Sequence, residues 1–226
     1  MTRIAIIDNL RGLAFIFMII QHIFYFYDVS TYYETEYSKN IFIDLSGTIA
    51  RTLFIFLAGC SLVLNYKKNK ESFMKNKFKR NIEILFHAII ISITTYILYP
   101  EFYIRFGILH FIGLASILGS FIVPYPKLYI ILILLFSFVE PPKINNFIDT
   151  ITGASLKYNM MDWFPLFKWL PLFIFGMYFI ENYNIEKINI PENKLLSYLS
   201  KNSLNLYTSH VILLLFLFNK LKNIEF

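Results

Sequence analysis

Two stretches of the sequence, Phe106–Pro126 and Asn202–Asn219, contain no Asp, Glu, Lys or Arg. A helix needs about 20 predominantly apolar residues to cross the hydrocarbon core of a bilayer, and both stretches are about that long. Hydrophobic residues make up 57% of the 226 residues and charged residues 16%, whereas an average soluble domain has about 45–50% and about 25%. We therefore expect an all-α, multi-pass transmembrane helical bundle.

Seven apolar segments are candidate spans, so we expect about seven membrane helices, within a range of about six to eight. They are residues 4–27, 41–65, 82–99, 105–123, 127–139, 163–180 and 203–219. The fifth is the shortest and lies between Pro126 and Pro141. Because no internal repeat and no domain boundary is visible, we expect residues 1–226 to form a single transmembrane domain.

The loop at 67–80 predicts the orientation of the chain. Its basic residues are Lys67, Lys68, Lys70, Lys75, Lys77, Lys79 and Arg80, and its only acid is Glu71. Short loops rich in Lys and Arg stay on the cytoplasmic side, so we expect this loop and the N-terminus to be cytoplasmic in a plasma-membrane protein. The net charge of +6 then reflects topology and attraction to anionic lipid rather than binding of nucleic acid.

Ionisable side chains inside the apolar segments are the strongest indication of function, because each costs about 2.5–3.5 kcal/mol to insert. They are Asp8, Arg11, His22, Asp44, Arg51, His87, His110, Asp162 and His210. In the sequence, the acid nearest to His87 is Glu83, at the start of the same segment, and His87 is interpreted as structural. The single cysteine, Cys60, excludes an internal disulfide, and with four histidines it leaves little material for a zinc site. We therefore expect no metal.

Helical geometry groups these residues. Arg11 and His22 are eleven positions apart, which places them on one face of a helix and about 16 Å apart along its axis. Asp8 is close enough in sequence to pair with Arg11, and this pair is predicted to stabilise the first helix. Two further faces follow from the same spacing, one with Asp44 and Arg51 and the other with Ser203, Tyr207 and His210.

Five stretches together resemble a known family. IDNLRGLAFIFMIIQH (7–22) and RTLFIFLAGCSLVL (51–64) are similar to the first two helices of the transmembrane acyltransferase superfamily. FGILHFIGLASIL (106–118), DWFPLFKWLPLFIFGM (162–177) and LSKNSLNLYTSHVILL (199–214) resemble its DUF1624 branch, which is similar to heparan-alpha-glucosaminide N-acetyltransferase. The resemblance covers almost the whole chain, in order.

The resemblance implies a membrane enzyme that transfers an acyl group, most simply acetyl, from cytosolic acyl-CoA to a sugar hydroxyl or amine of a glycan or glycolipid. Arg11 and His22 match the Arg-x10-His pattern of the wider superfamily. One departure is clear. Heparan-alpha-glucosaminide N-acetyltransferase, the lysosomal member of the family, has Asn where this chain has His22, and its catalytic histidine follows in the next loop. In this chain residues 23–86 contain no histidine. Heparan chemistry is therefore not carried over.

Acyl transfer from a thioester needs a base near the acceptor and a donor for the developing oxyanion. His22 is the predicted base, because an imidazole with an unperturbed pKa of about 6.5 exchanges a proton near neutrality. Asp44 or Asp162 can orient it, and His110 completes the candidate catalytic set. The predicted acyl-CoA-binding residues are Arg11, Arg51, Ser203, Tyr207 and His210, with the arginines on the CoA phosphates. His110, Tyr207, Ser203 or Asn202 can donate to the oxyanion.

Other classes remain open from the sequence. A small transporter or channel would also place ionisable residues at the bilayer midplane, and a catalytically inactive acyltransferase homologue would share the motifs. The expected partners are membrane lipids, the acyl donor and a glycan-type acceptor, and a homo-oligomer is left open.

Overall fold

The computed structural model describes residues 4–31, 35–68, 70–185, 188 and 190–222. The regular structure in these residues is helical, apart from one isolated bridge between Phe106 and Trp163. Its α-helices are α1 (Ala5–Ser30), α2 (Ile41–Lys68), α3 (Phe73–Leu98), α4 (Ile108–Ile122), α5 (Tyr129–Phe138), α6 (Asn146–Thr152), α7 (Leu166–Asn182), α8 (Lys194–Lys201) and α9 (Ser203–Lys222). Two short 3-10 helices, η1 (Tyr37–Lys39) and η2 (Pro126–Leu128), lie between them. The all-α prediction is confirmed.

Three helices, α1, α2 and α3, are each long and apolar enough to cross a membrane. A fourth span is possible if α4 and Pro126–Phe138, which are bent by 119° relative to each other, count as one. The chain is thus a multi-pass helical membrane protein, but the described residues give three or four such spans against the seven predicted. Part of the difference arises because α4, α5 and α7 have 15, 10 and 17 residues, fewer than the roughly 20 that a straight crossing needs. Helix α9 has 20 residues but is not among the candidate spans found in the described residues.

The chain divides into two compact units. The first joins the residues up to Phe54 with those from Ile188 onward, and the second contains residues 55–187. Helix α2 belongs partly to each. The prediction of a single domain stays a prediction.

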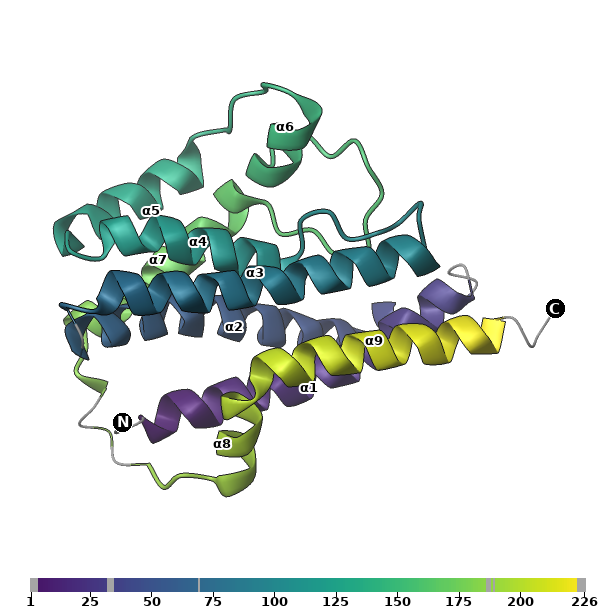
Figure 1. The fold of residues 1–226 in the computed structure, drawn as a ribbon, viewed down its shortest axis with the longest axis horizontal. Helices are drawn as coiled ribbons and strands as arrows, with labels where there is room; N and C mark the ends of the chain where they lie inside the picture. The colour runs from purple at the N-terminus through teal and green to yellow at the C-terminus, as the bar shows by residue number, and fades with distance from the viewer. Residues whose placement is uncertain (1–3, 32–34, 69, 186–187, 189, 223–226) are drawn as a thin grey trace. The chain divides into compact units, whose positions relative to one another are not determined.

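In the first unit, α1 and α9 lie side by side and run in the same direction (Figure 1). Ring contacts follow this register, with Phe15 5.6 Å from His210 and Tyr27 5.8 Å from Phe218 between centroids. Helix α8 packs against the start of α1, where a Cβ atom on Gly12 would lie 2.3 Å from the carbonyl oxygen of Leu196. Glycine therefore allows the two backbones to touch.

In the second unit, α2 and α7 are in backbone contact through two glycines. A Cβ atom on Gly59 would lie 2.0 Å from the carbonyl oxygen of Phe173, and one on Gly176 would lie 2.1 Å from that of Phe56. Between them, the thiol of Cys60 donates a hydrogen bond of 3.3 Å to the Gly176 carbonyl. Small residues of this kind allow membrane helices to approach closely where no hydrophobic effect drives them together.

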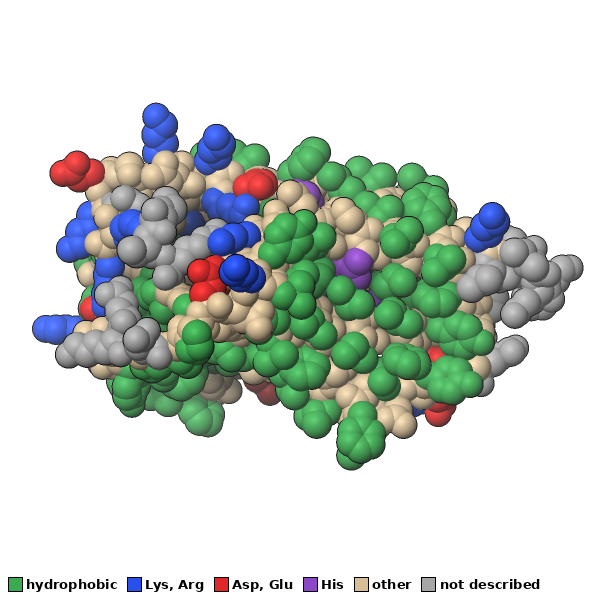
Figure 2. Space-filling view, turned by 90° about the horizontal axis from the view of Figure 1, so that it is seen from below, with side chains coloured by type: hydrophobic (Ala, Val, Ile, Leu, Met, Phe, Trp, Pro, Cys, Tyr) green, Lys and Arg blue, Asp and Glu red, His purple; other side chains and the backbone are tan. Residues whose placement is uncertain are grey.

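Helix α3 exposes a continuous apolar row. Each of these side chains is more than half exposed: Met74, Phe78, Ile82, Phe86, Ile89, Ile93, Tyr96 and Ile97. Hydrophobic side chains also cover much of the face drawn in Figure 2. A soluble protein would bury such a row, so these side chains are suited to contact with lipid.

Candidate functional site

A pair of histidines joins α1 to α9 in the first unit. Nδ1 of His22 lies 2.8 Å from Nε2 of His210, and the two rings are nearly parallel, with an interplanar angle of 13° and centroids 5.1 Å apart. Nδ1 of His210 lies 2.9 Å from the carbonyl oxygen of Leu206, one turn earlier in α9. The three groups form a continuous hydrogen-bonded row.

Aromatic rings surround this histidine pair. The rings of Tyr207 and His22 are in a T-shaped arrangement with centroids 6.0 Å apart, and the centroid of Phe26 lies 5.4 Å from that of His22. Phe15 packs edge-on against His210. Both histidines are partly buried, while Phe15, Phe26 and Tyr207 are buried. Such surroundings limit the access of water and strengthen the hydrogen bonds within the pair.

The predicted Asp8–Arg11 contact is present, and α8 takes part in it. Nη1 of Arg11 lies 3.7 Å from Oδ1 of Asp8, which is buried. The hydroxyl of Ser200 donates to that same oxygen at 2.8 Å and accepts from Arg11 at 3.4 Å. Arg11 is therefore held where α8 meets α1.

Asn9 makes a second attachment between α1 and the segment that leads into α8. Its amide donates to the carbonyl of Pro191 at 3.1 Å, and its oxygen accepts from the backbone N–H of Asn193 at 3.1 Å. Asn193 in turn caps α8 through its own side chain. Neighbouring residues on α1, Asp8 and Asn9, thus fix both the start and the end of this short helix.

Asp44 pairs with Arg51 within α2. Oδ1 of Asp44 is 3.4 Å from Nη2 of Arg51, which also donates to the hydroxyl of Thr48 at 2.8 Å. The Asp44 side chain is 67% exposed. At Nδ1 of His22 the hydrogen-bond partner is His210 rather than the acid that the sequence suggested.

His110 and Asp162 lie together in the second unit, at the start of α4. Oδ2 of Asp162 accepts from the backbone N–H of Ile108 at 3.0 Å. Pairing of two loops brings it there, because Met161 and Phe164 donate to the carbonyls of Phe102 and Phe106 at 2.8 and 3.1 Å. A carboxylate at the first turn of a helix is stabilised by unpaired N–H groups and the helix dipole, so Asp162 caps α4.

Both ring nitrogens of His110 are engaged. Nδ1 accepts from the backbone N–H of Gly107 at 3.3 Å. Nε2 lies 3.4 Å from the hydroxyl of Ser92, which donates its own hydrogen to the carbonyl of Ile104 at 2.6 Å. His110 must therefore donate from Nε2 and accept at Nδ1. In contrast, within the described residues no hydrogen bond engages Nε2 of His22.

The candidates thus fall into two groups. His22, His210, Tyr207, Ser203, Arg11, Asp8, Asp44 and Arg51 belong to the first unit, and His110 and Asp162 belong to the second. Sequence reasoning missed the hydrogen bond between His22 and His210, the hydroxyl of Ser200 and the carbonyl of Leu206. The part of the chain that the structure describes contains no group of three or more His, Cys, Asp or Glu residues placed to hold a metal ion.

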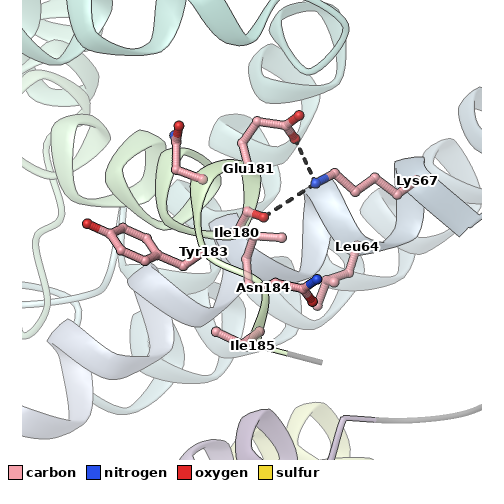
Figure 3. Close-up of a pocket in the computed structure, with 8 residues that line it drawn as sticks. Leu64, Lys67, Ile180, Glu181, Tyr183, Asn184 and Ile185 are labelled. Atoms are coloured by element: carbon pink, nitrogen blue, oxygen red, sulfur yellow. Dashed lines mark hydrogen bonds and ion pairs between the residues drawn. The ribbon is translucent and has the colours of Figure 1, made fainter. Parts of the chain in front are cut away.

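A separate pocket of about 240 Å³ lies in the second unit, where α2 and α7 end. Figure 3 shows Lys67 reaching across it, with Nζ 3.0 Å from Oε2 of Glu181 and 3.3 Å from the carbonyl oxygen of Ile180. The described residues that line this pocket include none of the candidates from the sequence. We interpret the lysine as a cap for the last turn of α7.

Comparison with known families gives one match. The family model described as "Heparan-alpha-glucosaminide N-acetyltransferase, catalytic" matches residues 3–212. No curated protein and no solved structure matches the chain. The matched range contains every candidate residue, and the resemblance inferred from the sequence is confirmed. The chain belongs to the heparan-alpha-glucosaminide N-acetyltransferase catalytic family, a family of membrane acetyltransferases that use acetyl-CoA as the acetyl donor.

Proposed function

We propose that this protein is an integral membrane acetyltransferase that moves an acetyl group from cytosolic acetyl-CoA to a sugar amine or hydroxyl of a glycan or glycolipid. Membership of the family supports the reaction class. The observation that carries the assignment to a site is the state of His22, a partly buried histidine in α1 with one ring nitrogen hydrogen-bonded and the other without a partner among the described residues.

In the proposed reaction, Nε2 of His22 takes the proton from the acceptor amine or hydroxyl as that group attacks the thioester carbonyl. The bond from carbonyl carbon to sulfur then breaks. The CoA thiolate leaves, and the His22 imidazolium returns the proton to it. A positioned base contributes about 10²–10⁴-fold to such a step. Tyr207, which lies beside the His22 ring, and Ser203 are the proposed oxyanion donors.

The contrast with His110 supports His22 as the base. A general base needs an unshared electron pair on a nitrogen that the substrate can reach. In His110 the electron pair on Nδ1 already accepts a hydrogen bond from the backbone N–H of Gly107. His110 and Asp162 are therefore proposed to shape the start of α4, whatever further part they take in the reaction. Arg11 and Arg51 remain the proposed partners of the CoA phosphates, because guanidinium groups bind phosphate oxygens in a bidentate manner.

Acetyl-CoA turnover tests this proposal directly. Protein purified in detergent is mixed with acetyl-CoA labelled in the acetyl group, alone and with glucosamine or glucose as simple acceptors. We expect saturable binding of acetyl-CoA and release of free CoA, with label on the acceptor that carries the correct nucleophile. A transporter would neither hydrolyse nor transfer the acetyl group, so binding without turnover would contradict the enzymatic assignment and favour an inactive homologue.

The proposed topology has the start of α1 and residues 67–80 in the cytoplasm, with about seven crossings. The parallel packing of α1 and α9 in the first unit supports an odd total, because two parallel spans must have an odd number of crossings between them. Short helices such as α4 and α7 would then cross with neighbouring loop residues or at a thinned part of the bilayer.

Labelling of introduced cysteines tests this orientation. Lys75→Cys should stay unlabelled by a membrane-impermeant maleimide in intact cells and react after permeabilisation, because Lys75 is exposed in the basic segment. Lys39→Cys, exposed in the loop before α2, is the matched position and should react from outside. The native Cys60 is buried and should contribute little background. Labelling of Lys75→Cys in intact cells would reverse the orientation.

A further inference from the structure

We infer that His210 is the positioning residue of this site: together with the Leu206 carbonyl it holds His22 in the one neutral tautomer whose Nε2 is free to act as a base. The inference rests on the proposed function for its catalytic consequence. The tautomer itself follows from the hydrogen bonds alone.

The row of hydrogen bonds has one end that cannot change direction. A backbone carbonyl oxygen only accepts, so Nδ1 of His210 must carry the hydrogen that it shares with Leu206 at 2.9 Å. In a neutral imidazole one nitrogen carries hydrogen and the other accepts. Nε2 of His210 is therefore an acceptor.

The second step passes this choice to His22. Since Nε2 of His210 accepts, Nδ1 of His22 must carry the hydrogen and donate it to that atom, 2.8 Å away. Neutral His22 then has its unshared electron pair on Nε2. Without the His210 ring and the Leu206 carbonyl, His22 would be free to exchange between its two neutral tautomers. In one of them Nε2 carries a hydrogen and cannot take the proton from the sugar amine or hydroxyl.

The pair also accommodates the charge that the reaction creates. When Nε2 of His22 takes a proton, the ring becomes an imidazolium whose Nδ1–H still donates to neutral His210. A hydrogen bond with one ionised partner is shorter and about twice as strong as a neutral one. The proton on Nε2 then passes to the departing CoA thiolate, and both rings return to their neutral state.

A histidine suits this position better than the carboxylate that the sequence suggested. An unpaired carboxylate in apolar surroundings is costly and changes its protonation rather than staying charged. Two neutral imidazoles joined to a carbonyl carry no net charge between catalytic cycles. The buried rings of Phe15, Phe26 and Tyr207 around them are compatible with a neutral pair.

Two substitutions separate the hydrogen bond from the packing. His210→Phe keeps an aromatic ring against His22 and Phe15 but removes the acceptor. His210→Gln keeps an oxygen that can accept from Nδ1 of His22. His87→Gln, in α3, is the control for loss of a histidine that has no proposed role in the reaction. Thermal unfolding of each variant in detergent checks that it is folded.

The readouts are nitrogen NMR of ¹⁵N-histidine protein, with the His22 signals assigned by their loss in His22→Gln, and steady-state acetyl transfer. We expect hydrogen on Nδ1 of His22 in the wild type, in His87→Gln and in His210→Gln. In His210→Phe we expect a mixture of tautomers. We also expect kcat for His210→Phe to fall about 10²-fold with KM little changed, as for a misplaced catalytic group, and His210→Gln to recover most of it.

The two proposals fail separately. Hydrogen on Nε2 of neutral wild-type His22 would overturn the positioning role, whether or not the protein transfers acetyl groups. Folded His210→Phe with the wild-type tautomer and kcat would overturn it as well. If the wild-type tautomer is as inferred but no acetyl-CoA is turned over, the hydrogen-bonded row stands and the proposed function fails. If His210→Phe does not fold, His210→Gln and the wild-type spectrum still decide the tautomer.

Discussion

The His22→Gln protein is expected to lose acetyl transfer by about 10²–10⁴-fold while it binds acetyl-CoA nearly as well as the wild type. Loss of a general base removes an interaction made mainly in the transition state, so kcat falls and the dissociation constant of the donor changes little. Glutamine approximates the length of histidine and can still hydrogen-bond to His210. Transfer of labelled acetyl and equilibrium binding of acetyl-CoA measure the two quantities separately.

His87→Gln is the matched control, because it removes a partly buried histidine from α3 without touching the proposed base. A folded His22→Gln protein with full activity per molecule would end the catalytic assignment. A variant that loses activity only in proportion to its loss of folded protein would reduce His22 to a packing role.

Gly176→Ala should destabilise the protein by about 1–3 kcal/mol, the usual cost of forcing extra atoms into a packed interior. The new Cβ would lie 2.1 Å from the carbonyl oxygen of Phe56. Backbone cannot rotate away as a side chain can, so α2 and α7 must separate and the hydrogen bond from Cys60 must lengthen. The unfolding midpoint in detergent measures the loss.

Gly113→Ala in α4 is the comparison for that substitution. Its Cβ would meet the Cδ2 atom of Leu85 at 2.7 Å, at the end of a flexible side chain that can move. Alanine also favours a helix over glycine by about 0.8–1.0 kcal/mol. We therefore expect Gly113→Ala to remain near the wild-type midpoint, and equal midpoints for the two variants would contradict the backbone contact between α2 and α7.

Hydropathy predicted the class of the fold and the positions of α1 and α2. It was wrong about the start of α3, which begins at Phe73, inside the segment 67–80 that was predicted as a loop, because the basic residues there lower the hydropathy without ending the helix. Segments 4–27 and 41–65 correspond closely to α1 and α2, because a mostly apolar run of that length has few other stable forms in a membrane. Hydropathy was less informative about how far each helix continues. The run at 105–139 was divided correctly near Pro126, but the sharp bend between α4 and Pro126–Phe138 depends on turn geometry and packing that composition does not encode.

In the candidate site, contacts within one helix could be predicted from the sequence, whereas contacts between helices far apart in the sequence could not. Asp8 with Arg11, and Asp44 with Arg51, are neighbours in one helix, so helical spacing alone brings them together. His22 and His210 are 188 residues apart, and only the packing of α1 on α9 pairs them. The role of Asp162 as a cap was also beyond reach, since it depends on the pairing of two loops.

The first unit is built from two segments of the chain that are separated by residues 55–187. Helix α1 is translated before α8 and α9: Ser200 follows Asp8 by 192 residues, and His210 follows His22 by 188 residues. Until then Asp8, Arg11 and His22 lack the partners on α8 and α9, although polar groups in hydrocarbon are costly. Contacts of such long sequence separation form late in folding. The histidine pair therefore cannot assemble before α9 has been translated, so the proposed site is complete only once that helix has joined α1.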